Sequence, residues 1–440
     1  MKHKTSIVIL TYNHLEYTKD CIESIRRYTE KGSYEIIIVD NHSTDNTKEW
    51  LQEQKDLKII WNKENLGFPV ACNQAIKIAN KNNDILLLNN DTIVTKNWLT
   101  NLKKCLYSNK KIGAVGSVCN HDENLQGSSF TYQNFEEMQK LAEENNISDP
   151  TRWEEKIFLI GFCLLMKRKV IHKIKKLDEK YSPGYVEDND LSLKIVKLGY
   201  QLMLCHDSFI HHYLGSSFRN DLNKFYPILN KNRKYFEKKW GFSTFCFDEI
   251  KFASNTLIED PKKILDLSSG IGTNLLKLKY NHPKAIIHGL ERNYSKFKIA
   301  KKVGTIYNDL SEIHTKYDYI LIGNLLEEVK DPILFLKKLE KYISKDGYIV
   351  GEIHNISNIK TISKLVDNQY FFENQNRSNH FTLTDIYQLF SELNYYHPKA
   401  YSWSDYPTEN EKILIQKLEE VNKRDYNISY YSFRFQKKDS

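Results

Sequence analysis

The stretch IIIVDNHSTD, residues 36–45, decides the fold of the first half of this chain. Four branched apolar residues in a row are typical of a strand buried on both faces, as strands are in parallel sheets. Polar residues follow at once, beginning with Asp40, as expected of a turn at the carboxyl end of such a strand. Ligands of open α/β sheets bind at that edge. An Asp there can accept a hydrogen bond from a nucleotide base or bind a ribose hydroxyl.

The alternation of strand and helix continues on both sides of this stretch. Apolar runs and amphipathic helical patterns follow one another, which predicts βαβ units and a mostly parallel sheet. The predicted strands are 6–10, 35–39, 57–61, 84–88 and 112–117, and the predicted helices are 15–28, 48–54, 70–80 and 98–107. Residues 158–166 are apolar enough for a further buried strand, and the polar stretch 121–155 predicts a loop or short helices.

A second alternation of the same kind fills the C-terminal half. Its predicted strands are 263–267, 285–290, 317–322 and 348–352, and an aromatic strand is expected at 430–435. One core rarely exceeds about 250–300 residues, so 440 residues predict two domains. We expect an α/β domain at 1–245 and a second α/β domain at 256–440, with a helical linker region at 220–255.

The composition excludes several classes of protein. Hydrophobic residues make up 40% and charged residues 27%, which is ordinary for a globular protein. The net charge of +8 is spread over both halves without a basic tail, so no nucleic-acid partner is expected. Seven cysteines without a CxxC pair predict reduced thiols and a cytoplasmic protein. No apolar stretch reaches the ~18 residues of a membrane span, and peripheral contact with the inner membrane face stays open.

The fourth predicted strand ends in Asn89-Asn90-Asp91. A carboxylate at the end of a buried strand can hold a divalent cation against a diphosphate, because Mg²⁺ is usually bound by one or two carboxylates together with phosphate oxygens. Taken alone, an Asp at such a place is most often a turn residue or a helix cap. The order and spacing of several such segments carry more weight than any one of them.

Four segments together resemble family 2 glycosyltransferases of the GT-A fold: SIVILTYNHLEYTKDCIESI, IIIVDNHSTDNT, NLGFPVACNQAI and LLLNNDTIV. The resemblance runs from about Thr5 to Phe218. It implies transfer of one sugar from a nucleoside-diphosphate sugar, with a UDP-sugar favoured, and a Mn²⁺ or Mg²⁺ ion. The family's Asp-X-Asp element keeps only its last carboxylate here. The residues that the resemblance places at the nucleotide sugar are Thr11, Asn13, Asp40, Asn65, Gly67, Asn73, Asn90 and Asp91, with Asp91 also a metal ligand.

Two later segments match the same family. GYVEDNDLSLK, residues 184–194, looks like its acidic motif at the start of a helix. Acidic residues are also favoured at helix N-termini for structural reasons. Sugar transfer needs a base that takes the acceptor's proton, and the resemblance implies Asp188 as that base with Glu187 positioning the acceptor or the base. His212, which fits the family's His-x-x-Gly-Ser spacing better than His211, is implied as a ligand of the metal or the pyrophosphate.

The C-terminal half begins with KILDLSSGIGTN, residues 263–274, which predicts a strand, a glycine-containing turn and a helix. With later segments it resembles class I S-adenosylmethionine-dependent methyltransferases over about residues 255–437. This sequence departs from the family's pattern at two places. Ser268 stands where the family has the first glycine of the loop, and Glu327-Glu328 stands where the family usually has an acidic residue followed by His. The implied contacts of S-adenosylmethionine are Asp266, Gly270, Gly272, Glu291 and Asp309.

The two resemblances therefore imply an inverting, metal-dependent glycosyltransferase with a methyltransferase-like domain. The expected acceptor is a glycan, a lipid-linked molecule, or a protein or peptide. Two hypotheses for the C-terminal half stay open: it methylates the product, or it is a scaffold that docks an acceptor or pairs subunits in a homodimer. A nucleotidyltransferase is the weaker alternative, since TYNH at 11–14 is not the Gly-rich phosphate loop that it usually has.

Overall fold

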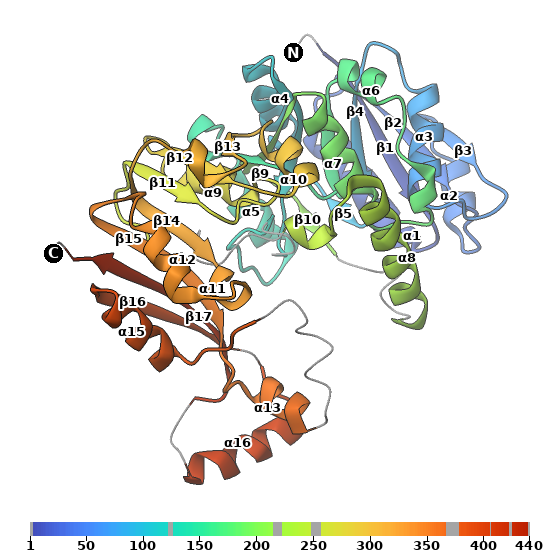
Figure 1. Ribbon diagram of the computed structural model, residues 1–440. Helices are drawn as coiled ribbons and strands as arrows, with labels where there is room; N and C mark the ends of the chain where they lie inside the picture. Colours follow the sequence, from blue (N-terminus) through green and yellow to red (C-terminus); the bar gives the residue numbers. More distant parts are fainter. Residues whose placement is uncertain are drawn as a thin grey trace. The chain divides into compact units, whose positions relative to one another are not determined.

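The computed structural model describes residues 3–121, 126–213, 222–247, 257–366, 378–404, 406–421 and 425–438. The chain divides into two compact units, Met1–Asp248 and Glu249–Ser440, and each unit has its own sheet. Both sheets are α/β sheets with helices packed on their faces (Figure 1). Among the described residues no helix is long and apolar enough to cross a membrane.

The first unit contains a mixed sheet of eight strands in the order β3-β2-β1-β4-β8-β6-β9-β7. The strands β1 to β4 are parallel, β6 is parallel to β9, and β8 and β7 run antiparallel to their neighbours. This confirms the predicted GT-A-like, mostly parallel arrangement. The strands are β1 (Thr5–Thr11), β2 (Tyr34–Asp40), β3 (Leu57–Trp61), β4 (Asp84–Asn89), β6 (Ile112–Val118), β7 (Trp153–Lys156), β8 (Cys163–Met166) and β9 (Gln201–Phe209).

Buried branched side chains hold the centre of this sheet. Ile7, Ile9, Ile36, Ile38 and Leu86 are at most 1% exposed, which explains why these segments form strands rather than helices. A short second sheet pairs β5 (Thr92–Ile93) with β10 (His211–His212). The helices of the unit are α1 (Leu15–Tyr28), α2 (Thr47–Gln52), α3 (Phe68–Ile78), α4 (Trp98–Ser108), α5 (Phe135–Asn145), α6 (Arg168–Ile174), α7 (Glu187–Lys197) and α8 (Leu222–Trp240).

One predicted strand of this unit is only partly right. Within 158–166, only Cys163–Met166 is a strand, and residues 157–162 form a loop. The apolar side chains of this loop are nevertheless buried, as Leu159 and Phe162 show with exposures of 0% and 2%. Because these side chains are buried although their backbone is not part of a strand, the apolar pattern alone could not distinguish a buried loop from a strand.

The second unit contains a seven-stranded sheet in the order β13-β12-β11-β14-β15-β17-β16. Its first five strands are parallel and the last two antiparallel, which confirms the predicted class I methyltransferase-like fold. The strands are β11 (Lys263–Asp266), β12 (Ile286–Leu290), β13 (Thr305–Tyr307), β14 (Tyr317–Gly323), β15 (Ile343–His354), β16 (Tyr395–Ser404) and β17 (Ile428–Lys437).

Helices cover the faces of this second sheet and extend beyond it. They are α9 (Thr273–Asn281), α10 (Tyr294–Ala300), α11 (Leu325–Glu328), α12 (Pro332–Leu339), α13 (Ile359–Val366), α15 (Leu383–Glu392) and α16 (Glu409–Val421). The helices α13 and α16 pack on one another around Ile359, Ile415 and Tyr426.

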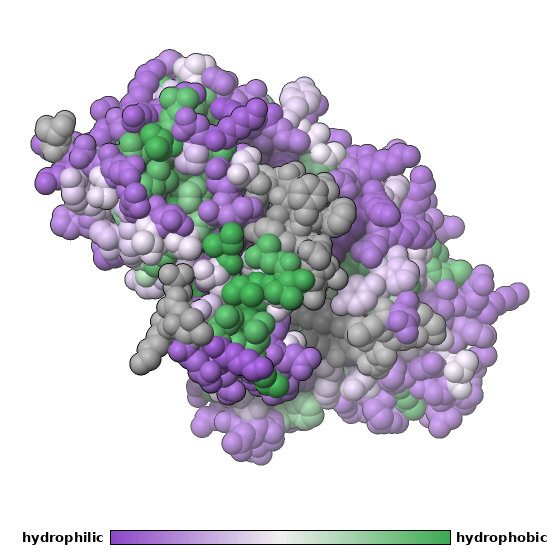
Figure 2. Space-filling model, turned by 60° about the horizontal axis from the view of Figure 1, so that its bottom comes forward, coloured by the Kyte–Doolittle hydropathy of each residue, from purple (hydrophilic) through white to green (hydrophobic). Residues whose placement is uncertain are grey.

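The molecular face drawn in Figure 2 is mostly hydrophilic, with hydrophobic residues gathered in smaller groups.

Candidate functional site

The carboxyl ends of β1, β2 and β4 lie side by side and bring three predicted segments to one edge of the first sheet. The parallel register aligns Thr11 with Asp40, and Leu10 with Asn89. Asp91 follows Asn89 by two residues. The residues predicted at the nucleotide and at the metal therefore come from neighbouring strands of a single edge, which is where α/β sheets bind ligands.

The turns after β1 and β2 are tied together by hydrogen bonds. Asp40 is 2% exposed, and each of its two carboxylate oxygens accepts a hydrogen bond from the Ser43 amide at 3.2 Å. Ser43 Oγ in turn accepts from the Asn13 amide at 2.8 Å, and Asn13 Oδ1 accepts from the Thr44 amide at 2.7 Å. Asn13 thus uses its side-chain oxygen to organise the edge on which Asp40 is presented.

The turn before α3 packs directly against the loop that precedes the acidic motif. Gly67 has φ +81°, and a Cβ at this position would lie 2.5 Å from Pro183 Cα. The Phe68 amide donates to the Pro183 carbonyl at 2.7 Å, and Asn65 Oδ1 accepts from the Gly67 amide at 3.0 Å. Only glycine fits this approach, because both its conformation and the available space exclude a side chain.

Asn73 forms hydrogen bonds to the loop that precedes the acidic motif. Its Nδ2 donates to the Leu177 carbonyl at 3.0 Å and to Glu179 Oε1 at 2.9 Å, and its Oδ1 accepts from the Leu177 amide at 2.9 Å. The amide group is therefore used to hold the loop at 177–179.

Asp91 and His212 form a buried pair at the sheet edge. Antiparallel pairing of β5 with β10 sets His212 opposite Thr92, and His212 Nε2 lies 3.1 Å from Asp91 Oδ1. Burial is the largest single influence on the pKa of His212 and would lower it, but hydrogen bonds and charge interactions with Asp91 and Cys119 together outweigh burial and raise this pKa to about 9. His211 instead contacts Tyr132, and burial lowers its pKa to about 4. The geometry thus sets His212, not His211, against Asp91.

The donor set of this pair fits a divalent cation that also binds phosphate. One carboxylate and one imidazole are fewer ligands than a cage built by the protein alone would need. No group of three or more His, Cys, Asp or Glu side chains suited to a metal occurs in the described part of the chain. Mg²⁺ and similar ions in phosphate-transferring sites keep water and substrate oxygens as their remaining ligands. Asp91 and His212 would be the residues that hold such an ion.

The paired acids begin α7, and one loop links them to the Asp91–His212 pair. Asp188 Oδ2 accepts from the Gly161 amide at 3.4 Å. The next residue, Phe162, stacks its ring on His212 at 5.2 Å between ring centroids. The backbone carbonyl of Phe162 accepts a hydrogen bond from the Asn89 amide at 2.9 Å. Two consecutive loop residues therefore connect the acidic motif to His212 and to the end of β4.

The environment of the paired acids disfavours two negative charges. Burial is the main cause that raises the pKa of Asp188, to about 6. Burial also raises the pKa of Glu187, and the neighbouring charge of Asp188 raises it further. Glu187 Oε2 is buried without a hydrogen-bond partner among the described residues. The pair is therefore poised to hold one proton near neutral pH, as an acid–base site requires.

Replacement of Glu187 by Gln is expected to stabilise the first unit at pH 8 by about 1–3 kcal/mol. The unfolded-state pKa of Glu is about 4.3. Because the folded-state pKa is raised above that value, the wild type loses stability as pH rises between the two values, and Gln removes this loss. Urea denaturation at pH 4.5 and pH 8 tests this. The gain should be small at pH 4.5, and Glu16→Gln, at a 79% exposed side chain, should show none at either pH. An equal gain at both pH values would contradict the argument.

The second unit gathers its predicted cofactor residues at the carboxyl edge of its own sheet. Register aligns Asp266 with Gly289, and Leu290 with Tyr307, so the turns after β11, β12 and β13 are neighbours. Asp266 is fully buried, and burial raises its pKa to about 6. Its Oδ1 accepts from the Ser268 amide at 3.0 Å, while Oδ2 is buried without a partner among the described residues.

The other residues predicted at S-adenosylmethionine shape the same edge. Gly272 has φ +98°, and a Cβ there would lie 2.5 Å from Val303 Cγ2. Glu291 accepts from the Asn293 amide at 2.6 Å, and Asp309 caps a short 3-10 helix at Leu310–Glu312. The orphaned oxygen of Asp266 and the glycine turn fit a nucleoside cofactor. Gly270, in the same turn as Gly272, also has a positive φ of +54°.

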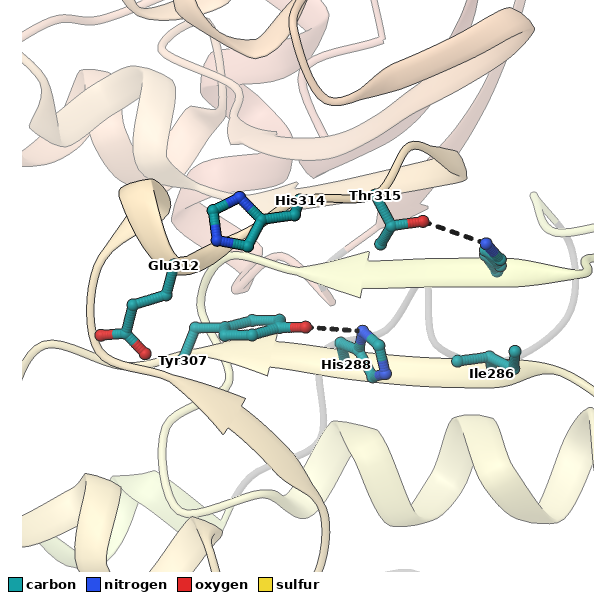
Figure 3. Close-up of a pocket in the computed structure, with 7 residues that line it drawn as sticks. Ile286, His288, Tyr307, Glu312, His314 and Thr315 are labelled. Atoms are coloured by element: carbon teal, nitrogen blue, oxygen red, sulfur yellow. Dashed lines mark hydrogen bonds between the residues drawn. The ribbon is translucent and has the colours of Figure 1, made fainter.

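A separate cavity of ≈ 330 Å³ lies on the face of the second sheet (Figure 3). Tyr307 Oη lies 3.3 Å from His288 Nδ1, and Lys263 Nζ donates to Thr315 Oγ1 at 3.0 Å. The lining residues are Lys263, Ile286, His288, Tyr307, Glu312, His314 and Thr315, and none of the predicted cofactor residues is among them.

Sequence reasoning missed several residues that build the first site. Gly161 and Phe162 lie in a stretch expected to be a strand, yet they join the acids to the Asp91–His212 pair. Asn232, in the stretch expected to be a linker, donates to the loop before the acids. The stretch 220–240 contains four Asn residues, and no local feature of the sequence distinguishes Asn232 from the other three. The Gly215-Ser216 part of the His-x-x-Gly-Ser spacing lies outside the described residues.

Comparison with protein families agrees with the two folds. Residues 6–175 match the family described as glycosyl transferase family 2, and residues 238–397 match a methyltransferase domain. An uncharacterized glycosyltransferase of Methanocaldococcus jannaschii, MJ1057, is 27% identical over 253 residues, which are 53% of this chain and 82% of that protein. Glycosyltransferase GlyG of Streptococcus pneumoniae is 25% identical over 183 residues, or 40% of this chain and 60% of that protein.

Solved structures are more distant. The crystal structure of GalNAc-T7 with UDP, GalNAc and Mn²⁺ shares 17% sequence identity with this chain and has a TM-score of 0.45. The match covers 64% of this chain and 55% of that one. This chain thus spans little more than half the length of GalNAc-T7 and of GlyG.

Proposed function

We propose that this chain, which carries a family 2 glycosyltransferase domain followed by a methyltransferase domain, transfers one sugar from a nucleoside-diphosphate sugar to an acceptor hydroxyl or amide. A UDP-sugar is the favoured donor, and the acceptor is a glycan, a lipid-linked molecule, or a protein or peptide. The observation that carries the proposal is the link from Asp188 through Gly161 and Phe162 to the Asp91–His212 pair. It supports one site that holds a base beside a place for a diphosphate.

In the proposed reaction each residue has one task. Asp40 binds the base or ribose, and Asp91 with His212 would hold a divalent cation. A bound Mn²⁺ or Mg²⁺ supplies positive charge against the charge that develops on the leaving diphosphate. Asp188 takes the proton from the acceptor as the acceptor attacks the anomeric carbon. A single displacement of this kind inverts that carbon and needs no protein nucleophile.

The test is nucleotide release from a panel of UDP-, GDP- and dTDP-sugars with Mn²⁺ or Mg²⁺. We expect release from at least one donor, strictly dependent on the metal, and an inverted anomeric configuration of the product by NMR. Release that is independent of metal would remove Asp91 and His212 from the proposed role. Release of pyrophosphate from a nucleoside triphosphate and a sugar phosphate would favour the nucleotidyltransferase alternative instead.

We propose that residues 1–245 form the glycosyltransferase domain and residues 256–440 the methyltransferase-like domain. Six of the cysteines are free and buried in the first unit, which supports a reducing, cytoplasmic location. For the second domain, the buried Asp266 oxygen without a partner favours a cofactor site over a pure scaffold. Asp266, Gly270, Gly272, Glu291 and Asp309 would hold S-adenosylmethionine, which supplies the methyl group when it is bound.

Calorimetric titration with S-adenosylmethionine separates the two hypotheses for the second domain. We expect binding to the wild type, and an affinity that is about 10–100-fold lower in Glu291→Ala, because hydrogen bonds to a charged carboxylate contribute about 1.5–3 kcal/mol. Glu392→Ala, on the exposed end of α15, serves as the control and should bind as the wild type does. Absence of binding to the wild type at millimolar ligand would favour the scaffold.

A further inference from the structure

The two residues in front of the paired acids have a strained backbone. Tyr185 has φ 73° and Val186 has φ 74°, in the left-handed region that favours glycine. For an L-residue this conformation costs about 1–2 kcal/mol, and a β-branched residue such as Val is especially disfavoured there. Glu187 is the first residue of α7, so this turn sets the direction in which Glu187 and Asp188 leave the loop. Strain of this kind persists only where surrounding contacts enforce it.

Asn232 of α8 supplies those contacts. Its side chain is fully buried. Nδ2 lies 2.7 Å from the carbonyl oxygen of Tyr181, 2.7 Å from that of Gly184 and 3.0 Å from that of Tyr185. An amide nitrogen has two hydrogens, so the three carbonyl groups share them. One side chain thereby fixes the loop on both sides of Pro183 and up to the strained turn.

A second set of contacts fastens α8 to the first turn of α7. Asp190 is 1% exposed, and its Oδ1 accepts from Trp240 Nε1 at 2.8 Å and pairs with Lys239 Nζ at 2.7 Å. Lys194 Nζ lies 3.0 Å from Asp190 Oδ2. The buried charge is thus compensated by two lysines. Figure 1 shows α7 and α8 in the same part of the first unit.

We infer that α8 belongs to the catalytic apparatus of the first unit, and that Asn232 is the positioning residue for Glu187 and Asp188. This inference rests on the proposed glycosyltransferase function. The helix α8 begins 47 residues after residue 175, where the match to the glycosyltransferase family ends. Asn232 does not touch the reacting atoms. It acts by holding the strained turn through which the acids are presented.

The inference predicts which kinetic parameter changes. Without the amide, the loop at 181–185 can relax its strained turn, and a displacement of about 1 Å at a catalytic group costs about 100-fold in rate. Asp40, Asp91 and His212 come from other elements and keep their contacts. We therefore expect Asn232→Ala to lower kcat about 10–100-fold while the Mn²⁺ affinity stays within about twofold.

The experiment uses the full chain and a matched control. Asn230 is exposed on the same helix, so Asn230→Ala removes the same group without touching the loop. For both variants, nucleotide release from the active donor yields kcat and KM, and calorimetry yields the Mn²⁺ and nucleotide diphosphate affinities. If Asn232→Ala does not fold, Asn232→Ser, which keeps one donor, replaces it and should retain more activity.

Two results would overturn the inference. If Asn232→Ala has the kcat of Asn230→Ala, the acids do not depend on this amide. If Asn232→Ala raises KM and weakens Mn²⁺ binding as much as it lowers kcat, the residue supports the fold in general and positions nothing in particular. A wild-type chain that releases no nucleotide from any donor would instead contradict the proposed function, and the inference would fall with it.

Discussion

Asp188→Asn is expected to lower kcat for sugar transfer by about 10²–10⁴-fold, because general-base catalysis contributes a factor of that size. Asn keeps the shape of Asp and can still accept from the Gly161 amide, so the loop should remain in place. What is lost is the ability to take the acceptor's proton. Steady-state nucleotide release with the active donor measures the loss, and the donor KM should change little since Asp40 and Asp91 are untouched.

The pH profile distinguishes loss of a base from a general loss of structure. Burial raises the pKa of Asp188 to about 6, so the wild-type kcat/KM should fall with decreasing pH below about 6, where the base becomes protonated. Asp188→Asn should lose this acidic limb and show a flat, low profile. Asp56→Asn, which breaks an exposed pair with Arg26, should keep the wild-type profile. Wild-type rates in Asp188→Asn would remove Asp188 from the mechanism.

The second large effect concerns the metal. Asp91→Ala is expected to abolish activation by Mn²⁺ and to lower kcat about 10²–10³-fold, because the cation that Asp91 would hold stabilises the negative charge that develops on the leaving diphosphate. Asp91 is 7% exposed and lies 3.1 Å from His212, so its removal takes away the one carboxylate of the proposed metal site.

Two titrations measure this effect. In the first, the rate is followed against Mn²⁺ concentration, and the wild type should saturate while Asp91→Ala should not. In the second, calorimetry with the nucleoside diphosphate and Mn²⁺ should show affinity that falls in Asp91→Ala and is unchanged in Asp149→Ala, a substitution at a side chain that caps a 3-10 helix. Unaltered metal activation of Asp91→Ala would mean that the cation binds elsewhere or that the diphosphate alone holds it.

The parts of the fold that follow from local pattern could be predicted. The helix at 15–28 and the strand at 57–61 have the predicted bounds, because amphipathic spacing and branched apolar runs are local signals. The position of Asp40 and Asp91 at one edge of the sheet also followed, since parallel strands end at the same edge. Polar residues directly after apolar strands were therefore a sufficient guide to that edge.

The parts that depend on distant contacts could not be predicted. The sequence contains no local signal that β8 inserts between β4 and β6 in the antiparallel direction, or that the apolar loop before it runs past the strand ends to reach Asp188. Asn73 had the appearance of a ligand contact, yet its partners lie 104 residues further on. The role of Asn232 depends on a helix packing against a loop 48 residues earlier.

The close approach of Gly67 to Pro183 bears on any attempt to retarget this protein to another sugar. Residue 67 has no room for even a methyl group, and its neighbour donates to the Pro183 carbonyl. A larger side chain packed against residue 67 would displace the segment that leads to Glu187. Redesign of donor choice by mutagenesis should therefore spare this contact.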